Sequence, residues 1–176
     1  MKREAIIELW ERHARYEFET KDADAAVSTM VSDASVMHLP TMSGATGREA
    51  LREYYRDVFI PAIPDGTVNE PVARFVGDDF LVDQAIMQIL HDREIPYLLP
   101  GLAPTGVALE VPFAVFVTFR DGLMSSERLY WDHAQVLAQL GLVSGRGLAI
   151  TDPSAVTTFL RETACHYPRE YRHCRH

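Results

Sequence analysis

Two long apolar stretches joined by a tight turn occupy residues 107–131 and constrain the fold more than any other feature. The stretches are Val107–Phe119 and Leu123–Trp131, and the Asp-Gly pair at 121–122 between them is typical of a hairpin turn. Beyond Trp131 the apolar residues change from alternate to helical spacing, and this pattern stops at Gly141. The region therefore predicts an antiparallel hairpin followed by a short helix.

The second strand of this hairpin carries an unusual polar face. Side-chain alternation places Arg128 and Tyr130 on one face with Asp132, which lies at the junction with the helix, and Glu127 on the opposite face. A face of this composition is too polar for an ordinary core and too ordered for a plain solvent face. We therefore predict that Arg128, Tyr130 and Asp132 form the wall of a pocket.

A second hairpin and a long loop precede this region. Val72–Val76 and Phe80–His91 flank a Gly-Asp-Asp turn, and Asp92–Gly106 then separates the two hairpins. The loop is too long for a tight connection and too apolar to lie bare in water. It is therefore predicted to fold over something, such as the mouth of the pocket.

The N-terminal part of the chain predicts helices and one short strand. An amphipathic helix over residues 4–20 has an inward stripe that includes the polar residues His13 and Glu17. The other expected segments are a short helix with Val27, Met30 and Val31, a strand at Ser35–Leu39, a turn-rich loop at Thr41–Gly47 and a helix with a stripe from Leu51 to Phe59. Helices followed by antiparallel strands predict an α+β fold.

The C-terminal part reads as an extension of this domain. A last helix is expected to start at Asp152 and Pro153, an N-cap followed by proline at the first helical position. We predict one domain over residues 1–143, and an extension over 144–176 made of this docking helix and a polar, frayed tail.

Composition excludes several classes of protein. The 176-residue chain has a net charge of −8 and no basic patch in its body, which argues against nucleic acid as the main partner. No apolar run approaches the ~20 residues that would span a membrane. The N-terminus lacks the features of a signal peptide, and the two cysteines lie in the last dozen residues, so a cytoplasmic location is expected.

The strand Val107–Phe119 has apolar residues on both faces, including Val115 on one and Phe116 on the other. A sheet buried on both faces needs helices on one side and a further cover on the other. The sequence therefore predicts a homodimer formed through the outer face of the sheet.

Three segments resemble the SnoaL-like polyketide cyclases of the nuclear-transport-factor-2 (NTF2) superfamily. They read HLPTMSGATGREALREYY, LPGLAPTGVALEVPFAVFVTFRDG and SERLYWDHAQVLAQLGL, and the resemblance covers roughly residues 5–143. It implies a cone-shaped, cystatin-like α+β fold in which helices pack on a curved antiparallel sheet around a deep cavity. It also implies a cofactor-free protein that dimerises through its outer sheet face. The related cyclases close a ring by intramolecular aldol condensation with an aspartate near the end of the final strand, which corresponds to Asp132, and His91 matches an assisting histidine on a preceding strand.

Each candidate residue also has a structural explanation. Asp132 precedes His133-Ala134-Gln135 and could cap the following helix, a role compatible with facing a cavity. His91 could be a hydrogen-bonded core or rim residue, and Asp83 could pair with Arg74 or Arg128 across strands.

The remaining candidates are expected to bind rather than to react. Arg128 beside Asp132 could form a charge clamp or a structural salt bridge. His38, Tyr16, Tyr54 and Tyr55 could line the cavity and donate hydrogen bonds to a substrate oxygen, or could simply pack in the core.

Several kinds of site find no support in the sequence. The histidines in the body of the chain are not at paired metal-ligand spacing, so no metal site is predicted. There is no phosphate-binding glycine loop and no nucleophile motif.

Three functions remain open. The first is a cofactor-independent enzyme acting on a small apolar carbonyl or polyketide-like compound: Asp132 removes a proton beside the carbonyl, Tyr130 or His91 steadies the enolate oxygen, and cyclisation, isomerisation or dehydration follows. The second is a hydrolase of an epoxide or lactone, with Asp132, Arg128 and Asp83 orienting a water. The third is a non-catalytic module for ligand binding or dimerisation.

Overall fold

The computed structural model describes residues 1–143 and 147–164. The predicted polar tail and both cysteines lie outside these residues. The elements are the helices α1 (Arg3–Phe18), α2 (Ala23–Ser28), α3 (Arg48–Tyr54), α4 (His133–Gln139) and α5 (Pro153–Thr163), the π-helical turn η1 (Tyr55–Phe59) and 3-10 turn η2 (Ile60–Ala62) that continue α3, and the strands β1 (Met30–His38), β2 (Ser43–Thr46), β3 (Val68–Val76), β4 (Phe80–Leu90), β5 (Ala108–Arg120) and β6 (Leu123–Trp131).

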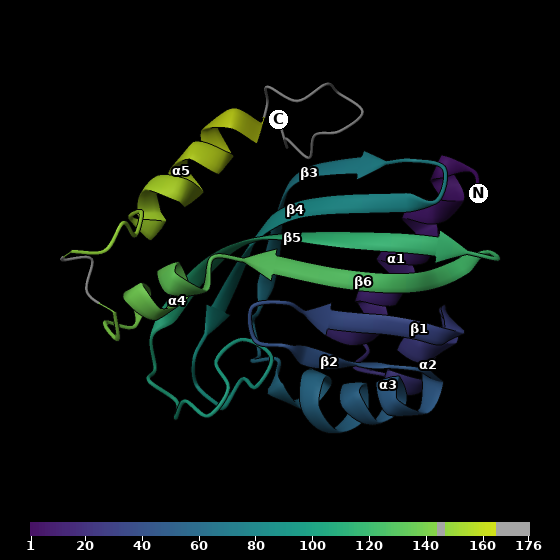
Figure 1. Cartoon of the computed structure of the whole chain (residues 1–176), viewed down its shortest axis with the longest axis horizontal. Coiled ribbons are helices and arrows are strands. Elements are labelled where there is room, and N and C mark those ends of the chain that lie inside the picture. The colour runs from purple at the N-terminus through teal and green to yellow at the C-terminus, as the bar shows by residue number, and fades with distance from the viewer. Residues whose placement is uncertain (144–146, 165–176) are drawn as a thin grey trace.

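The six strands form one curved sheet in the order β2-β1-β6-β5-β4-β3 (Figure 1). The two predicted hairpins, β3–β4 and β5–β6, are both present. The expectation of an antiparallel sheet holds for every pair except β1 and β6, which run parallel. These two strands are distant in sequence, so no turn residues between them could reveal their direction.

The inner face of the sheet is covered by the N-terminal helices. α1 buries Ile6, Leu9 and Trp10 against it, and the predicted polar members of its stripe, His13 and Glu17, are buried too. Strand residues such as Val111 and Val115 belong to the same hydrophobic core. The cone-shaped arrangement of helices on a curved sheet is therefore confirmed.

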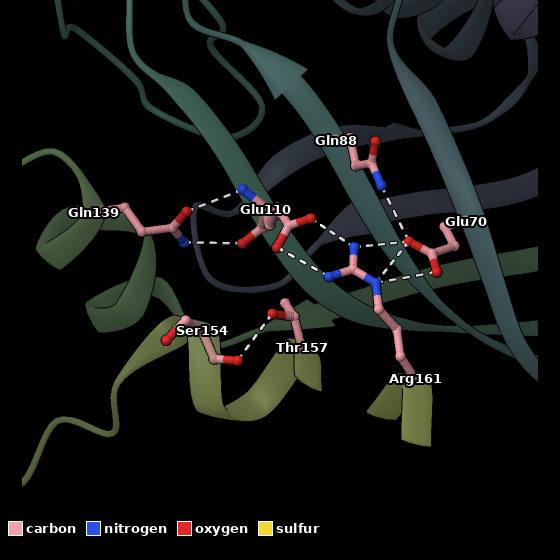
Figure 2. Close-up of polar contacts among 7 residues, drawn as sticks. All are labelled: Glu70, Gln88, Glu110, Gln139, Ser154, Thr157 and Arg161. Carbon is pink, nitrogen blue, oxygen red and sulfur yellow. Dashed lines mark hydrogen bonds and ion pairs between the residues drawn. The ribbon is translucent and has the colours of Figure 1, made fainter. Parts of the chain in front are cut away.

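The outer face of the sheet is partly covered by α5. Leu160 packs on Val72, Ala73 and Ile86 in a second, smaller hydrophobic cluster. Arg161 lies between carboxylates of β3 and β5, the strands on either side of β4: it is 2.8 Å from Glu70 Oε2 and 2.5 Å from Glu110 Oε1 (Figure 2). The same figure shows Gln139 of α4 paired through its side-chain amide with the backbone of Glu110. The C-terminal helices are thus fastened to β3 and β5 by polar contacts around a small apolar centre.

Two N-terminal boundaries differ from the prediction. Met30 and Val31 start β1 instead of ending the second helix, because that helix stops at Ser28. The expected loop at 41–47 contains the short strand β2, which pairs with β1. A Cβ at Gly44 would lie 2.1 Å from the carbonyl oxygen of Val36, so glycine permits this close pairing.

No helix within residues 1–143 and 147–164 combines the length and apolar character needed to cross a lipid bilayer.

Candidate active site

A cavity of about 340 Å³ lies between α1, the inner face of the sheet and the loop that joins β4 to β5. Among its lining residues Glu11, Asn69 and Pro71 are exposed, which places the opening between α1 and β3. The larger apolar side chains of the lining are Trp10, Phe18, Phe59, Met87, Leu98, Val111, Phe113, Val115, Leu129 and Trp131. Such a concave, mostly apolar site with a few polar groups is typical of a small-molecule pocket.

The loop between β4 and β5 closes this cavity, as its apolar sequence predicted. Ile95, Leu98 and Leu99 are buried, and Tyr97 and Leu98 line the cavity. The hydroxyl of Thr41 donates a hydrogen bond to the carbonyl oxygen of Tyr97 at 2.7 Å, which ties the loop to the β1–β2 turn. The loop thus forms part of the cavity wall.

Three buried ionisable side chains, His13, Glu17 and Glu127, meet at the wall of the cavity. His13 and Glu17 are one turn apart on α1, and His13 Nε2 lies 3.1 Å from Glu17 Oε1. Glu127 comes from β6, and its Oε2 lies 3.6 Å from the same nitrogen. Glu17 and Glu127 both line the cavity. A carboxylate pair at an apolar cavity is thus held by one histidine.

Both ring nitrogens of His13 act as donors. The hydroxyl of Thr29 gives its hydrogen to the carbonyl of Ala26 at 2.6 Å, so it accepts from His13 Nδ1, at 2.7 Å. Nε2 faces carboxylate oxygens. Burial alone would lower the pKa of His13, but Glu17 and Glu127 outweigh burial and raise it to about 10. His13 is therefore an imidazolium at neutral pH.

Glu127 is the carboxyl group best suited to proton transfer. Burial and the charge of Glu17 raise its pKa, and the imidazolium of His13 opposes that rise. Its Oε2 has no hydrogen-bond partner in the described part of the chain. A carboxyl group in this state takes up and releases a proton nearer neutral pH than an exposed glutamate does.

Asp83, one of the residues predicted to bind substrate, lines the same cavity. It accepts hydrogen bonds from Trp10 Nε1 at 2.7 Å and from Arg74 Nε at 2.6 Å. The predicted cross-strand pair with Arg74 is confirmed, and Arg74 also contacts Glu11 at the opening. Asp83 is thus a fixed, paired carboxylate between the opening and the interior.

His38 also lines the cavity, and it is almost fully buried. Burial lowers the pKa of His38 to about 4, although Glu127 and the carbonyl of Ser43 favour the charged form. The ring is therefore neutral at neutral pH, in contrast to His13. It packs among the rings of Phe59, Tyr97 and Trp131.

The prediction that Arg128, Tyr130 and Asp132 form the pocket wall is wrong. Arg128 and Tyr130 lie on the outer face of the sheet, where Tyr130 packs edge-on against Phe116 and is 45% exposed. Asp132 is exposed and accepts a hydrogen bond from the backbone N–H of Gln135 as the N-cap of α4. The cavity is instead lined by the alternate residues Glu127, Leu129 and Trp131.

Three other candidates also lie away from the cavity lining. His91 is buried beside the loop, with Nδ1 3.0 Å from Thr105 Oγ1, and its backbone holds Thr105, Gly106 and Val107 in place. Tyr16 is partly buried against the main core. Tyr55 is fully buried, and its hydroxyl lies 3.2 Å from His13 Nε2. It therefore contacts the charged cluster without lining the cavity.

His13, Glu17 and Glu127 are also the described residues whose ligand atoms could gather around a metal ion, since these atoms lie within 4.8 Å of one another. In the arrangement present here both nitrogens of His13 donate hydrogen bonds or face carboxylates. In this arrangement the three side chains form a hydrogen-bonded charge network.

Sequence reasoning missed Glu127 and the buried cluster that it forms with His13 and Glu17. A signal for Glu17 was present, because the inward stripe of α1 included two polar residues that needed partners. For Glu127 the signal was its position on the same face as Leu129 and Trp131, which is the more apolar face of β6. The composition of that face pointed to the interior.

Comparisons with known proteins identify a matching family and solved structures with a similar fold. The family model of the SnoaL-like domain matches residues 5–127. No curated protein matches the chain. The solved structures that resemble it include an NTF2-like protein of unknown function from Burkholderia pseudomallei K96243, with a TM-score of 0.57 and 13% identity over 77% of this chain and 96% of that chain.

Two further structures share the same fold. A protein from Jannaschia sp. CCS1, assigned to the SnoaL-like polyketide cyclases, has a TM-score of 0.58 and 20% identity over 78% of this chain and 94% of that chain. SalBIII, an epoxide hydrolase/cyclase-like enzyme of pyran ring formation in the polyether salinomycin, has a TM-score of 0.51 and 19% identity, over 73% and 88% of the two chains. The predicted NTF2-like α+β fold is confirmed.

Proposed function

Since the chain belongs to the SnoaL-like domain family, we propose that it is an enzyme that acts on a small, largely apolar carbonyl or polyketide-like compound by acid/base chemistry. The acid/base group in this proposal is Glu127, in place of Asp132. The reaction class is intramolecular aldol cyclisation, isomerisation or dehydration.

One observation carries the proposal: a buried carboxyl group of raised pKa lines an apolar cavity, beside a fixed imidazolium. Burying the Glu127 carboxyl group is unfavourable unless interactions with a partner or a ligand compensate for its lost hydration. Perturbed carboxyl groups in enclosed pockets are a common feature of catalytic sites.

The chemistry balances without an oxidant or reductant. Glu127 takes a proton from the carbon beside a carbonyl group, and the C–H electron pair moves into the enolate. The enolate carbon then forms a C–C bond to a second carbonyl of the same molecule, and the resulting alkoxide takes the proton back from Glu127. One carboxyl group therefore serves as base and then as acid.

The other residues of the cavity have supporting roles in this reaction. The imidazolium of His13 compensates the negative charge on Glu127 in its ionised state. The apolar walls exclude water and favour a folded conformation of the substrate, which brings its two reacting ends together.

The proposal is tested with a panel of short diketones, starting with 2,6-heptanedione, whose aldol cyclisation and dehydration give a conjugated cyclohexenone. The protein should accelerate formation of this chromophore, and Glu127→Gln should lower the rate by about two to four orders of magnitude. Equal rates with the wild-type protein and with Glu127→Gln would remove Glu127 from the mechanism.

Hydrolysis of an epoxide is a second candidate, because the cavity holds a second carboxylate, Asp83, besides Glu127. In this reaction protonated Glu127 would donate to the epoxide oxygen while Asp83 activates a water that attacks the ring carbon. Ring opening of styrene oxide in ¹⁸O-labelled water, lost in Asp83→Asn, would support it. Loss of 2,6-heptanedione cyclisation in Glu127→Gln, with normal cyclisation in Asp83→Asn, would favour the carbonyl chemistry instead.

A further inference from the structure

A second polar region of the same cavity contains His38 and Tyr97. Their rings lie 5.2 Å apart between centroids and both line the cavity. His38 comes from the end of β1, and Tyr97 comes from the loop between β4 and β5. Neither residue is hydrogen-bonded to His13, Glu17 or Glu127 in the described part of the chain.

The hydrogen bonds of His38 determine which of its ring nitrogens is protonated. Nδ1 lies 3.2 Å from the carbonyl oxygen of Ser43. A carbonyl oxygen can only accept, so Nδ1 carries the hydrogen. The hydroxyl of Tyr54 also lies close to Nδ1, at 3.1 Å, and can donate to Ser43 Oγ, at 3.2 Å.

The other nitrogen of His38 is therefore a bare acceptor. The ring is neutral, so Nε2 has a lone pair and no hydrogen. Nε2 has no hydrogen-bond partner among residues 1–143 and 147–164. Because Nδ1 is engaged with the β1–β2 turn, Nε2 is the atom left for a ligand in the cavity.

Tyr97 supplies the complementary group. Its side chain is only 3% exposed, and its hydroxyl has no hydrogen-bond partner in the described residues. Burial raises the pKa of Tyr97, so the hydroxyl keeps its hydrogen and can donate. An unpartnered buried hydroxyl is unfavourable in the ligand-free protein and calls for an explanation.

We propose that His38 and Tyr97 form a subsite for a hydroxyl group of the substrate, with His38 Nε2 accepting its hydrogen and Tyr97 donating to its oxygen. A carbonyl oxygen could accept from Tyr97 but would leave His38 unmatched. An ammonium group could donate to His38 but not accept from Tyr97. Only a group that donates and accepts at one atom satisfies both residues.

This inference rests on the proposed function and narrows its substrate class. With Glu127 at the carbonyl end, the substrate is a hydroxylated or enolised carbonyl compound. A ketone without a hydroxyl would leave the subsite unsatisfied and should bind more weakly than a hydroxylated ketone of the same shape.

The test compares two probes of the same shape, 6-hydroxy-1-tetralone and 6-methyl-1-tetralone, by isothermal titration calorimetry. The wild-type protein should bind the hydroxyl probe about tenfold more tightly than the methyl probe, as expected for a matched pair of hydrogen bonds. Equal affinities, or no binding of either probe, would overturn the proposal.

Two variants assign the preference to the subsite. Asn can place its amide nitrogen near the position of Nδ1, so His38→Asn keeps a donor for Ser43 and removes the acceptor at Nε2. Tyr97→Phe removes only the hydroxyl. Both should lower the preference for the hydroxyl probe several-fold, whereas Tyr16→Phe, outside the cavity lining, should leave it unchanged.

The unfolding temperature of Tyr97→Phe distinguishes a binding role of the Tyr97 hydroxyl from a structural one. Because the hydroxyl of Tyr97 is unpartnered, Tyr97→Phe should unfold at the same temperature as the wild-type protein or higher while it loses the preference. A destabilised Tyr97→Phe protein that retains the preference would overturn the proposal. Glu127→Gln should keep the preference, so failure of the catalytic proposal is recognised separately.

Discussion

At the scale of single residues, the charge on Glu127 depends on two neighbours with opposite effects. His13 lowers the pKa of Glu127 and Glu17 raises it. If Glu127 acts as the base, activity falls on the acid side as it becomes protonated. His13→Gln should move this acid limb of kcat/KM to higher pH, and Glu17→Gln should move it to lower pH, each by on the order of one unit. Parallel shifts in both variants would contradict this assignment.

The inward face of β6 could not be predicted from side-chain alternation alone. Alternation correctly separated Glu127 from Arg128, but it could not show which set faces inward. Glu127 is buried because His13, more than a hundred residues away in sequence, reaches it across the core. The apolar neighbours of Glu127 indicate an inward face, but the distant partner that stabilises a charge there is not identified by the sequence alone.

The unpartnered polar groups of Tyr97 and His38 could not be predicted from the sequence either. Nothing in the sequence distinguishes Tyr97 from the other tyrosines, because its role depends on the folding of a loop without regular structure. His38 was a sequence candidate, but its neutral state and tautomer follow from its burial and its contact with Ser43. Geometry is needed for both conclusions.

At the scale of elements, the hairpins and the last helix could be predicted because local signals mark their ends. The Gly-containing turns define β3–β4 and β5–β6, and Asp152 with Pro153 starts α5. The short strand β2 was missed because Ser43-Gly44-Ala45-Thr46 has the composition of a turn and is held only by pairing with β1. Tertiary pairing overrides local propensity there.

The docking of α5 depends on Arg161, which lies between Glu70 and Glu110 (Figure 2). These charges are about one-third exposed, so solvent screening limits their contribution to global stability to about 1 kcal/mol or less. Arg161→Gln should therefore change overall stability little but accelerate amide exchange in α5. Arg120→Gln, in an exposed ion pair with Asp33, is the matched control and should leave α5 unchanged. Unaltered exchange in Arg161→Gln would show that Leu160 and its apolar contacts hold the helix alone.

At the scale of the whole molecule, the uncovered part of the outer face supports the expectation of a homodimer. α5 covers the side of β3 and β4, whereas Phe116 and Tyr130 remain about half exposed. Exposed aromatic side chains on a sheet face are typical of an interface. Sedimentation of the wild-type protein should show a dimer at micromolar concentration, and Phe116→Lys should give a monomer. Phe159→Lys, on the exposed side of α5, should remain a dimer; a monomeric wild-type protein would contradict the prediction.

The combined contribution of the two buried histidines to folding stability should be greatest near pH 6.5, the ordinary histidine pKa. The folded pKa of His38 is about 4, so as pH falls from 6.5 to 4 the unfolded chain binds a proton that the folded chain does not, and stability decreases. The folded pKa of His13 is about 10, so its stabilisation is complete below 6.5 and is lost as pH rises to about 10.

Urea unfolding on both sides of this maximum checks the assignment. His38→Asn should flatten the acid side by up to about 3 kcal/mol, and His13→Gln should flatten the alkaline side. Profiles that stay parallel to that of the wild-type protein in both variants would show that other groups set the pH dependence.

The most direct test of Glu127 as the acid/base is the exchange of a substrate's α-protons with deuterated water, followed by NMR on 6-hydroxy-1-tetralone. This measurement isolates the proton-transfer step and needs no knowledge of the final product. Exchange should be catalysed by the wild-type protein and by Asp132→Asn, since Asn caps a helix about as well as Asp does. It should fall by about two to four orders of magnitude in Glu127→Gln. Loss of exchange in Asp132→Asn, with exchange preserved in Glu127→Gln, would contradict a reaction inside this cavity.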